Sequence, residues 1–190
     1  MAKKISKFKD TKIKNILTLI TIIILVSFGI RYVFFRKSHF ILDVIASIIL
    51  LGIFYKLYYK LNQDYISYFF LLFLLIIHSS ALYGSNIFGI QFENLLHFIG
   101  GFTIAIIIDR IFKEKLSKIE RFTLLIIFAL GIGAIMEIVE WSGYHILGEG
   151  EGLFYFGVGD EDAWNNTIID LIFNASGATL MGLITIFRKK

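Results

Sequence analysis

The chain has 190 residues, of which 57% are hydrophobic, and a formal net charge of +4. Soluble domains carry a smaller apolar fraction, so a soluble basic domain is not expected here. Without such a domain the positive charge does not indicate nucleic-acid binding, and no nucleic-acid partner is expected. The absence of Cys excludes disulfides, thiolate chemistry and zinc sites built on sulfur. The sequence predicts an all-α, polytopic membrane protein, a single integral membrane domain over residues 1–190 whose partners are membrane lipids.

Six apolar runs of about twenty residues, the length that a helix needs to cross the hydrocarbon layer, follow one another along the chain. These runs are Ile16–Phe35, Phe40–Tyr59, Ile66–Tyr83, Asn94–Phe112, Phe122–Trp141 and Thr167–Phe187. Residues 1–14 precede the first run as a basic tail, and the run is too long for a signal peptide. We therefore predict a bundle of six transmembrane helices.

Basic residues gather on one side of the predicted bundle. Of the 19 Lys and Arg residues, all but Arg31, Arg36 and Lys37 lie in the N-terminal tail, around the second or fourth connection, or at the C-terminus. Cytoplasmic loops of membrane proteins are enriched in Lys and Arg. This partition predicts a cell-membrane protein with both termini, including the tail 1–14, in the cytoplasm.

Histidine and carboxylate side chains gather on the opposite, outer side. Ionisable groups at membrane depth are costly, so several at one level indicate a shared polar pocket. Helical spacing places Glu93 and His97 on one face, and Asp170 and Asn174 on another. The candidate catalytic residues are His97, Glu137, Glu140 and Asp170. The candidate ligands of a divalent cation are His78, Glu93, His97, Glu140 and Asp170, and further pocket residues are Asn166, Asn174, Trp141 and Trp164.

Three functions are compatible with such a pocket. The first is an enzyme that acts on a lipid-linked or envelope substrate, with a cation or with carboxylates as acid and base. The second is a protein that binds or transports a cation or proton. The third is a membrane scaffold whose polar network only stabilises the bundle. The acids Asp160, Glu161 and Asp162 are most simply a solvated loop, although their oxygens are also cation ligands.

Three motifs between residues 93 and 182 resemble those of YjdF-like membrane proteins and, more distantly, of VanZ-like proteins. The segment Glu93–Phe98 is similar to an acid-basic-x-x-His-Phe motif, although Asn94 stands where the families carry Lys or Arg. The segment Glu137–Trp141 is similar to a Glu-x-x-Glu-Trp motif, and Asp170–Gly177 to an Asp-x-x-x-Asn-x-x-Gly motif. The resemblance implies an architecture with these residues at its centre, without implying a particular reaction.

The partition of basic residues gives a direct test of topology. Single substitutions Lys4→Cys, Glu151→Cys and Lys190→Cys introduce the only thiols of the chain. In intact cells, an impermeant thiol reagent should label only residue 151, because both termini are expected inside. Labelling of either terminus would contradict the predicted orientation.

Overall fold

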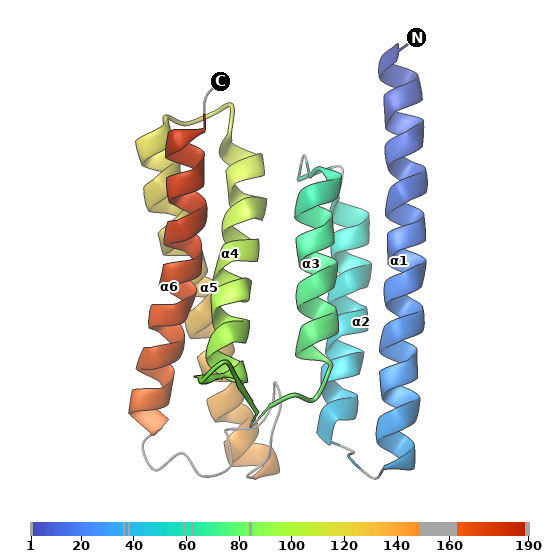
Figure 1. The fold of residues 1–190 in the computed structure, drawn as a ribbon, viewed down its shortest axis with the longest axis vertical. Coiled ribbons are helices and arrows are strands. Elements are labelled where there is room, and N and C mark those ends of the chain that lie inside the picture. Colours follow the sequence, from blue (N-terminus) through green and yellow to red (C-terminus); the bar gives the residue numbers. More distant parts are fainter. Residues whose placement is uncertain are drawn as a thin grey trace. The chain divides into compact units, whose positions relative to one another are not determined.

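The computed structural model describes residues 2–35, 37, 39–58, 60–61, 63–83, 85–148 and 163–188, with only the backbone described for 2–10, 39 and 163. These residues form six helices and one short hairpin (Figure 1). The chain divides into two compact units, Met1–Ser80 and Ala81–Lys190. The prediction of a single domain over 1–190 is not tested by this division and stays a prediction.

The first unit contains three helices, α1 (Ala2–Phe34), α2 (His39–Leu57) and α3 (Tyr65–His78). Apolar and aromatic side chains such as Leu25, Phe40 and Leu72 fill its core. Hydroxyl groups add cross-links between the helices. The Tyr32 hydroxyl donates to the Ser79 carbonyl over 2.5 Å, and the Oγ atoms of Ser47 and Ser79 lie 2.9 Å apart.

The predicted basic tail continues directly into the first helix. Helix α1 begins at Ala2, so residues 2–14 are helical and form no separate element. Lys14 is only 5% exposed, and its ammonium lies 3.9 Å from the centre of the Tyr55 ring. A cation over an aromatic face is attracted by the ring's quadrupole, which accounts for a buried lysine here.

Five helices are long and apolar enough to cross a membrane, and α3 is shorter, with 14 residues. A helix of that length rises about 21 Å, compared with about 30 Å of hydrocarbon. Hydropathy predicted the third span to extend to Tyr83, but the helix ends at His78. The Ser80 hydroxyl donates to the Ile77 carbonyl, and Ala81 adopts a positive φ of 55°, which turns the chain away from the helix axis.

The second unit contains α4 (Phe92–Phe112), α5 (Lys118–Leu147) and α6 (Ala163–Phe187). Strands β1 (Asn86–Ile87) and β2 (Ile90–Gln91) form an antiparallel hairpin directly before α4, which the sequence analysis did not predict. Helix α5 has 30 residues and extends beyond both ends of its predicted span. Figure 1 shows that α4 and α6 begin at the same end of this unit, which we call the site end.

Glycines let the helices of the second unit approach closely. A Cβ atom at Gly101 would collide with the Asn174 backbone carbonyl, and one at Gly177 would collide with the Phe98 carbonyl. Helices α4 and α6 are therefore in backbone contact where they cross, and each helix contributes one of the two glycines. Small residues at helix interfaces are the usual route to close packing in membranes, where lipid provides no hydrophobic drive between helices.

Hydrogen bonds fix the other end of this unit, the turn end between α4 and α5. Ser117 and Glu120 form a reciprocal capping box at the start of α5. The Lys118 ammonium donates to the carbonyls of Ile186 and Arg188 over 2.6 and 3.0 Å, and so satisfies the C-terminus of α6. Asp109 and Arg121 form a buried ion pair at 2.5 Å between α4 and α5.

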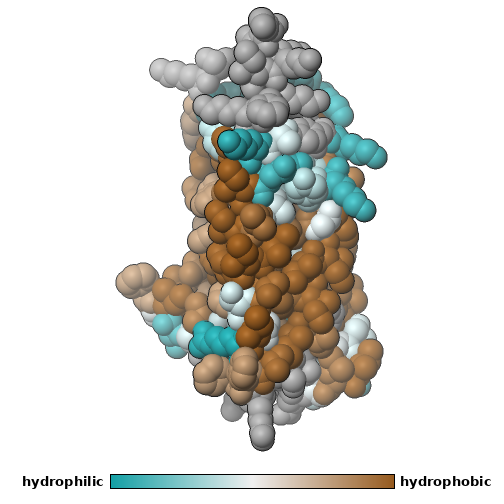
Figure 2. All heavy atoms as spheres, turned by 90° about the vertical axis from the view of Figure 1, so that its right-hand side faces the viewer, coloured by the Kyte–Doolittle hydropathy of each residue, from teal (hydrophilic) through white to brown (hydrophobic). Residues whose placement is uncertain are grey.

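The surface agrees with a lipid environment. Figure 2 shows, on the α1 side of Figure 1, hydrophobic side chains over most of the height and hydrophilic ones gathered towards the ends. Helix α1 exposes large apolar side chains over its second half, among them Leu19, Ile23 and Ile30. Apolar patches of this extent are not normal on soluble monomers.

The glycine crossing predicts a large loss of stability from small changes. Gly101→Ala and Gly177→Ala should each lower the free energy of unfolding by about 1–3 kcal/mol or more, because the added methyl meets backbone that cannot rotate away. Gly131→Ala is the matched control, since nothing lies within 4 Å of a Cβ at that position. Thermal unfolding in detergent measures the difference. Equal melting temperatures for all three variants would contradict the close crossing.

Candidate functional site

Buried stripes on α5 and α6 bring polar side chains to the interior of the second unit. On α5 the buried residues recur every three or four positions: Arg121, Leu125, Ala129, Gly133, Glu137, Glu140 and Gly143. On α6 the buried residues include Asp170, Asn174, Ala178 and Met181. Because i and i+4 share a helix face, each stripe faces inward along its whole length. Carboxylates occur on these stripes only towards the site end.

Asn174 lies where the three helices meet. Its amide Nδ2 lies 3.0 Å from Nδ1 of His97 on α4. A Cβ at Gly133 of α5 would lie 2.6 Å from the same amide nitrogen, so this glycine provides the space for the Asn174 side chain. When the amide donates this hydrogen bond, His97 carries its proton on Nε2. The orientation of the Asn174 amide and the tautomer of the histidine are therefore linked.

The other nitrogen of His97 faces two carboxylates. Its Nε2 lies 3.6 Å from Oδ1 of Asp170 and 3.9 Å from Oε1 of Glu137. Asp170 is fully buried and Glu137 is 6% exposed. Both separations exceed an ordinary hydrogen bond of 2.7–3.2 Å, so the two carboxylates lie at ion-pair distance from the imidazole rather than at hydrogen-bond distance.

Thr167 positions Glu137. Its hydroxyl donates to Oε2 of Glu137 over 2.9 Å, which leaves Oε1 as the oxygen on the side of His97. Thr167 is not among the site residues predicted from the sequence. Its spacing of three residues from Asp170 places it on the same face of α6, which was the available signal.

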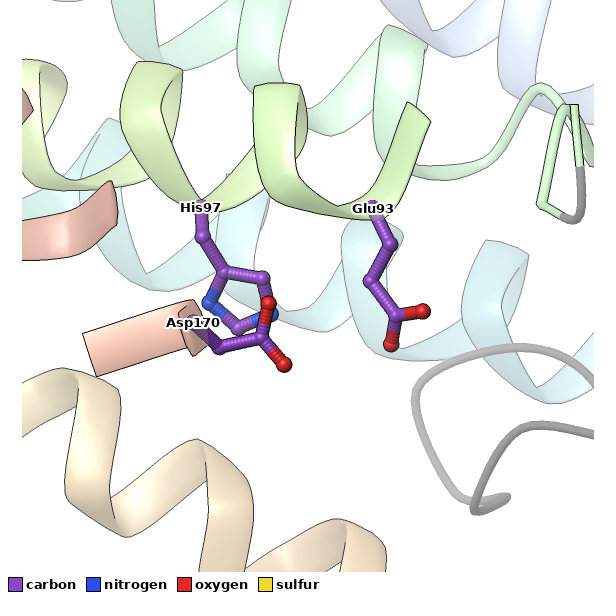
Figure 3. Close-up of side chains that lie close together, drawn as sticks. All are labelled: Glu93, His97 and Asp170. Atoms are coloured by element: carbon purple, nitrogen blue, oxygen red, sulfur yellow. The ribbon is translucent and has the colours of Figure 1, made fainter. Parts of the chain in front are cut away.

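Glu93 completes a group of three potential metal ligands. Single ligand atoms of Glu93, His97 and Asp170 all lie within 4.8 Å of one another. Figure 3 shows Glu93 and His97 projecting from the same side of α4, with Asp170 reaching the imidazole from α6. Two carboxylates and one imidazole suit divalent cations such as Mn²⁺ and Zn²⁺.

The structure does not place the remaining predicted residues in this group. Glu140 is buried one turn beyond Glu137 on α5 but lies outside the three-ligand group. Trp141 and Trp164 are 57% and 71% exposed, and Asn166 is half-buried. His78 belongs to the first unit, so its position relative to this site is not described. The acids Asp160, Glu161 and Asp162 lie outside the described residues.

Among the described residues, the titratable side chains around the site are carboxylates, apart from His97. The sequence contains no Lys or Arg in residues 81–109 or 122–187, while Glu93, Glu137, Glu140 and Asp170 all fall in those segments. An anionic group would be repelled from this end of the unit, and a cation would be attracted to it. The composition thus favours a positively charged ligand.

The chain belongs to a family described as predicted membrane protein (DUF2238), whose model matches residues 13–190. The match covers both units and agrees with the apolar helices. No curated protein and no solved structure gives a significant match.

The contacts of Asn174 predict that its side chain stabilises the unit. Asn174→Ala leaves Nδ1 of His97 without this partner and should lower the free energy of unfolding by about 1–3 kcal/mol. Ser176→Ala is the matched control, because Ser176 is exposed on the same helix and its hydroxyl bonds only locally, to the Ile172 carbonyl. Thermal unfolding in detergent compares them. Equal melting temperatures would show that the hydrogen bond to His97 contributes nothing.

Proposed function

We propose that this member of the family holds a divalent cation with Glu93, His97 and Asp170, and that the site acts on a lipid-linked or envelope substrate at the outer face of the cell membrane. The observation that carries the proposal is the approach of three ligand atoms from two helices to within 4.8 Å. Ligand atoms around bound zinc lie roughly 3–3.5 Å apart, so modest side-chain rotation closes the group on an ion. Glu93, only half-buried, has the freedom for that rotation.

The neighbouring side chains support cation binding. A histidine that ligates through one nitrogen usually donates from the other to a fixed acceptor. Rotation of the Asn174 amide by half a turn would present its oxygen to Nδ1 of His97, so Asn174 can act as a hydrogen-bond partner of either tautomer. Glu137, with one oxygen held by Thr167, would then be the nearby base for a water molecule on the cation.

A bound cation would also allow this acidic site to hold an anionic substrate. Lipid-linked phosphates are anionic, and the site end carries carboxylates without Lys or Arg. A bound divalent cation would supply the positive charge that a phosphate requires and would polarise its oxygen. Without a cation this pocket would repel such a substrate.

The proposed topology has six spans with both termini in the cytoplasm. In the second unit, the Lys and Arg residues lie at the turn end or at the C-terminus, which would be cytoplasmic by the distribution of basic residues. The site end would then face outward. The short helix α3 would cross the membrane as well, and so bring the number of spans to six, if the bilayer thins around it. The resemblance to YjdF-like and VanZ-like proteins is part of this proposal.

Transport of a cation across the membrane is less well supported than binding of a cation at one end of the unit. Between Glu137 and Arg121 the buried stripe of α5 consists of Gly133, Ala129 and Leu125. On α6, Asn174, Ala178, Met181 and Thr185 continue the buried face beyond Asp170. These stripes offer a cation no ionisable group on the way to the turn end.

The scaffold alternative makes a different prediction from the cation site. Asp170→Asn and Glu140→Gln keep size and hydrogen-bonding capacity but remove charge. If Asp170 ligates a cation, Asp170→Asn should reduce affinity at least about tenfold while the melting temperature of the cation-free protein changes little. Isothermal titration of the detergent-purified protein with Zn²⁺, Mn²⁺ and Mg²⁺ measures the affinity.

A matched control and a cellular readout complete this test. His145→Gln is the control, because His145 is exposed and its contacts are local, with the carbonyl and ring of Trp141. We expect Asp170→Asn to abolish any growth or antibiotic-resistance phenotype of the protein, and Glu140→Gln, one turn from Glu137 on α5, to reduce it. Wild-type protein that binds none of the cations, or both variants with full phenotype, would favour the scaffold.

A further inference from the structure

The connection between α3 and α4 carries no charged residue. From Ser79 to Phe92 the sequence contains only polar uncharged, aromatic, aliphatic and glycine residues. The connection between α4 and α5, by contrast, carries Lys113, Glu114 and Lys115. Loops in water are normally polar and often charged, so an uncharged connection with apolar residues indicates another environment.

The tip of the β1–β2 hairpin presents a bulky aromatic side chain. Ile87 pairs with Ile90, so Phe88 and Gly89 form a two-residue loop, and their φ angles are 53° and 83°. Two positive φ values are typical of a type I′ turn, where Asn-Gly is the preferred sequence. A phenylalanine at the first position is strained and 102% exposed. Turn formation does not explain its presence there.

The hairpin is held against the start of α4. The Phe92 amide donates to the Ser85 carbonyl over 2.9 Å, and the rings of Tyr83 and Phe92 meet edge to face at 5.9 Å. The candidate membrane span of α4 begins at Phe92. The tip therefore lies only a few residues from the membrane boundary, where aromatic side chains are enriched.

We propose that the hairpin tip inserts into the lipid interface beside the start of α4, with Phe88 as its anchor. Leu82 and Ile90, which are 45% and 42% exposed, extend the apolar surface of the same connection. The partner is the boundary between headgroups and acyl chains, because an uncharged, apolar tip gains from leaving water while the pairing of Ile87 with Ile90 satisfies part of its backbone. This inference does not depend on what the site binds.

Tryptophan fluorescence in nanodiscs tests the insertion. Phe88→Trp is made in the full chain with Trp141→Phe and Trp164→Phe, after thermal unfolding shows that this background folds. Lipids brominated near the headgroup end of the acyl chain should remove roughly half or more of the emission, as expected for an aromatic ring at the interface. Aqueous iodide should quench it far less than it quenches Glu114→Trp in the same background, which places the probe in the charged, exposed α4–α5 turn.

Other outcomes overturn the proposal. Iodide quenching equal to that of Glu114→Trp would place the tip in water. Protection from both quenchers would mean that the first unit, residues 149–162 or a second copy covers it. Phe88→Asn provides a separate check, because it creates the favoured Asn-Gly turn. Its melting temperature in detergent should be unchanged or higher, and a clear fall would show that Phe88 packs against protein.

Discussion

The backbone contact between α4 and α6 is the constraint on which the second unit depends. Gly101 and Gly177 each face the backbone of the opposite helix, so no side chain separates the two axes at their crossing. This approach places Asn174 within hydrogen-bonding distance of His97 and aligns Asp170 with the same imidazole. A wider crossing would separate these groups. The packing of small residues and the geometry of the polar site therefore have one origin.

The two ends of the second unit differ in how their buried carboxylates are paired. At the turn end, Asp109 is paired with Arg121 at close distance, and this pair needs no further partner to balance its charge. At the site end, Glu137 and Asp170 share a single histidine at longer distances. An excess of carboxylates inside a membrane is costly unless protons or a cation compensate for it. The first arrangement is a closed ion pair, and the second is the one on which the proposed cation site rests.

Helical periodicity predicted the parts of the site that come from regular helices. The spacing of Glu93 and His97, and of Asp170 and Asn174, placed each pair on one face, and the structure brings these residues together. Periodicity could not predict the end of α3, which depends on Ser80 and a positive φ at Ala81. Nor could it show that Trp141 and Trp164 face outward, since a helix near a membrane surface carries aromatic side chains on any face. The hairpin was missed because Phe88-Gly89 is not a typical turn sequence.

The hydrogen bonds of Lys118 have a consequence for biosynthesis. This lysine precedes its acceptors, the carbonyls of Ile186 and Arg188, by 68 and 70 residues, so they leave the ribosome much later. Thr167, Asp170 and Asn174 also arrive with α6. Until then, Glu137 on α5 lacks the hydroxyl that it accepts from. Until α6 is inserted, α4 and α5 therefore lack the helix that supplies partners to Lys118 and Glu137, and a chain truncated before α6 should be less stable.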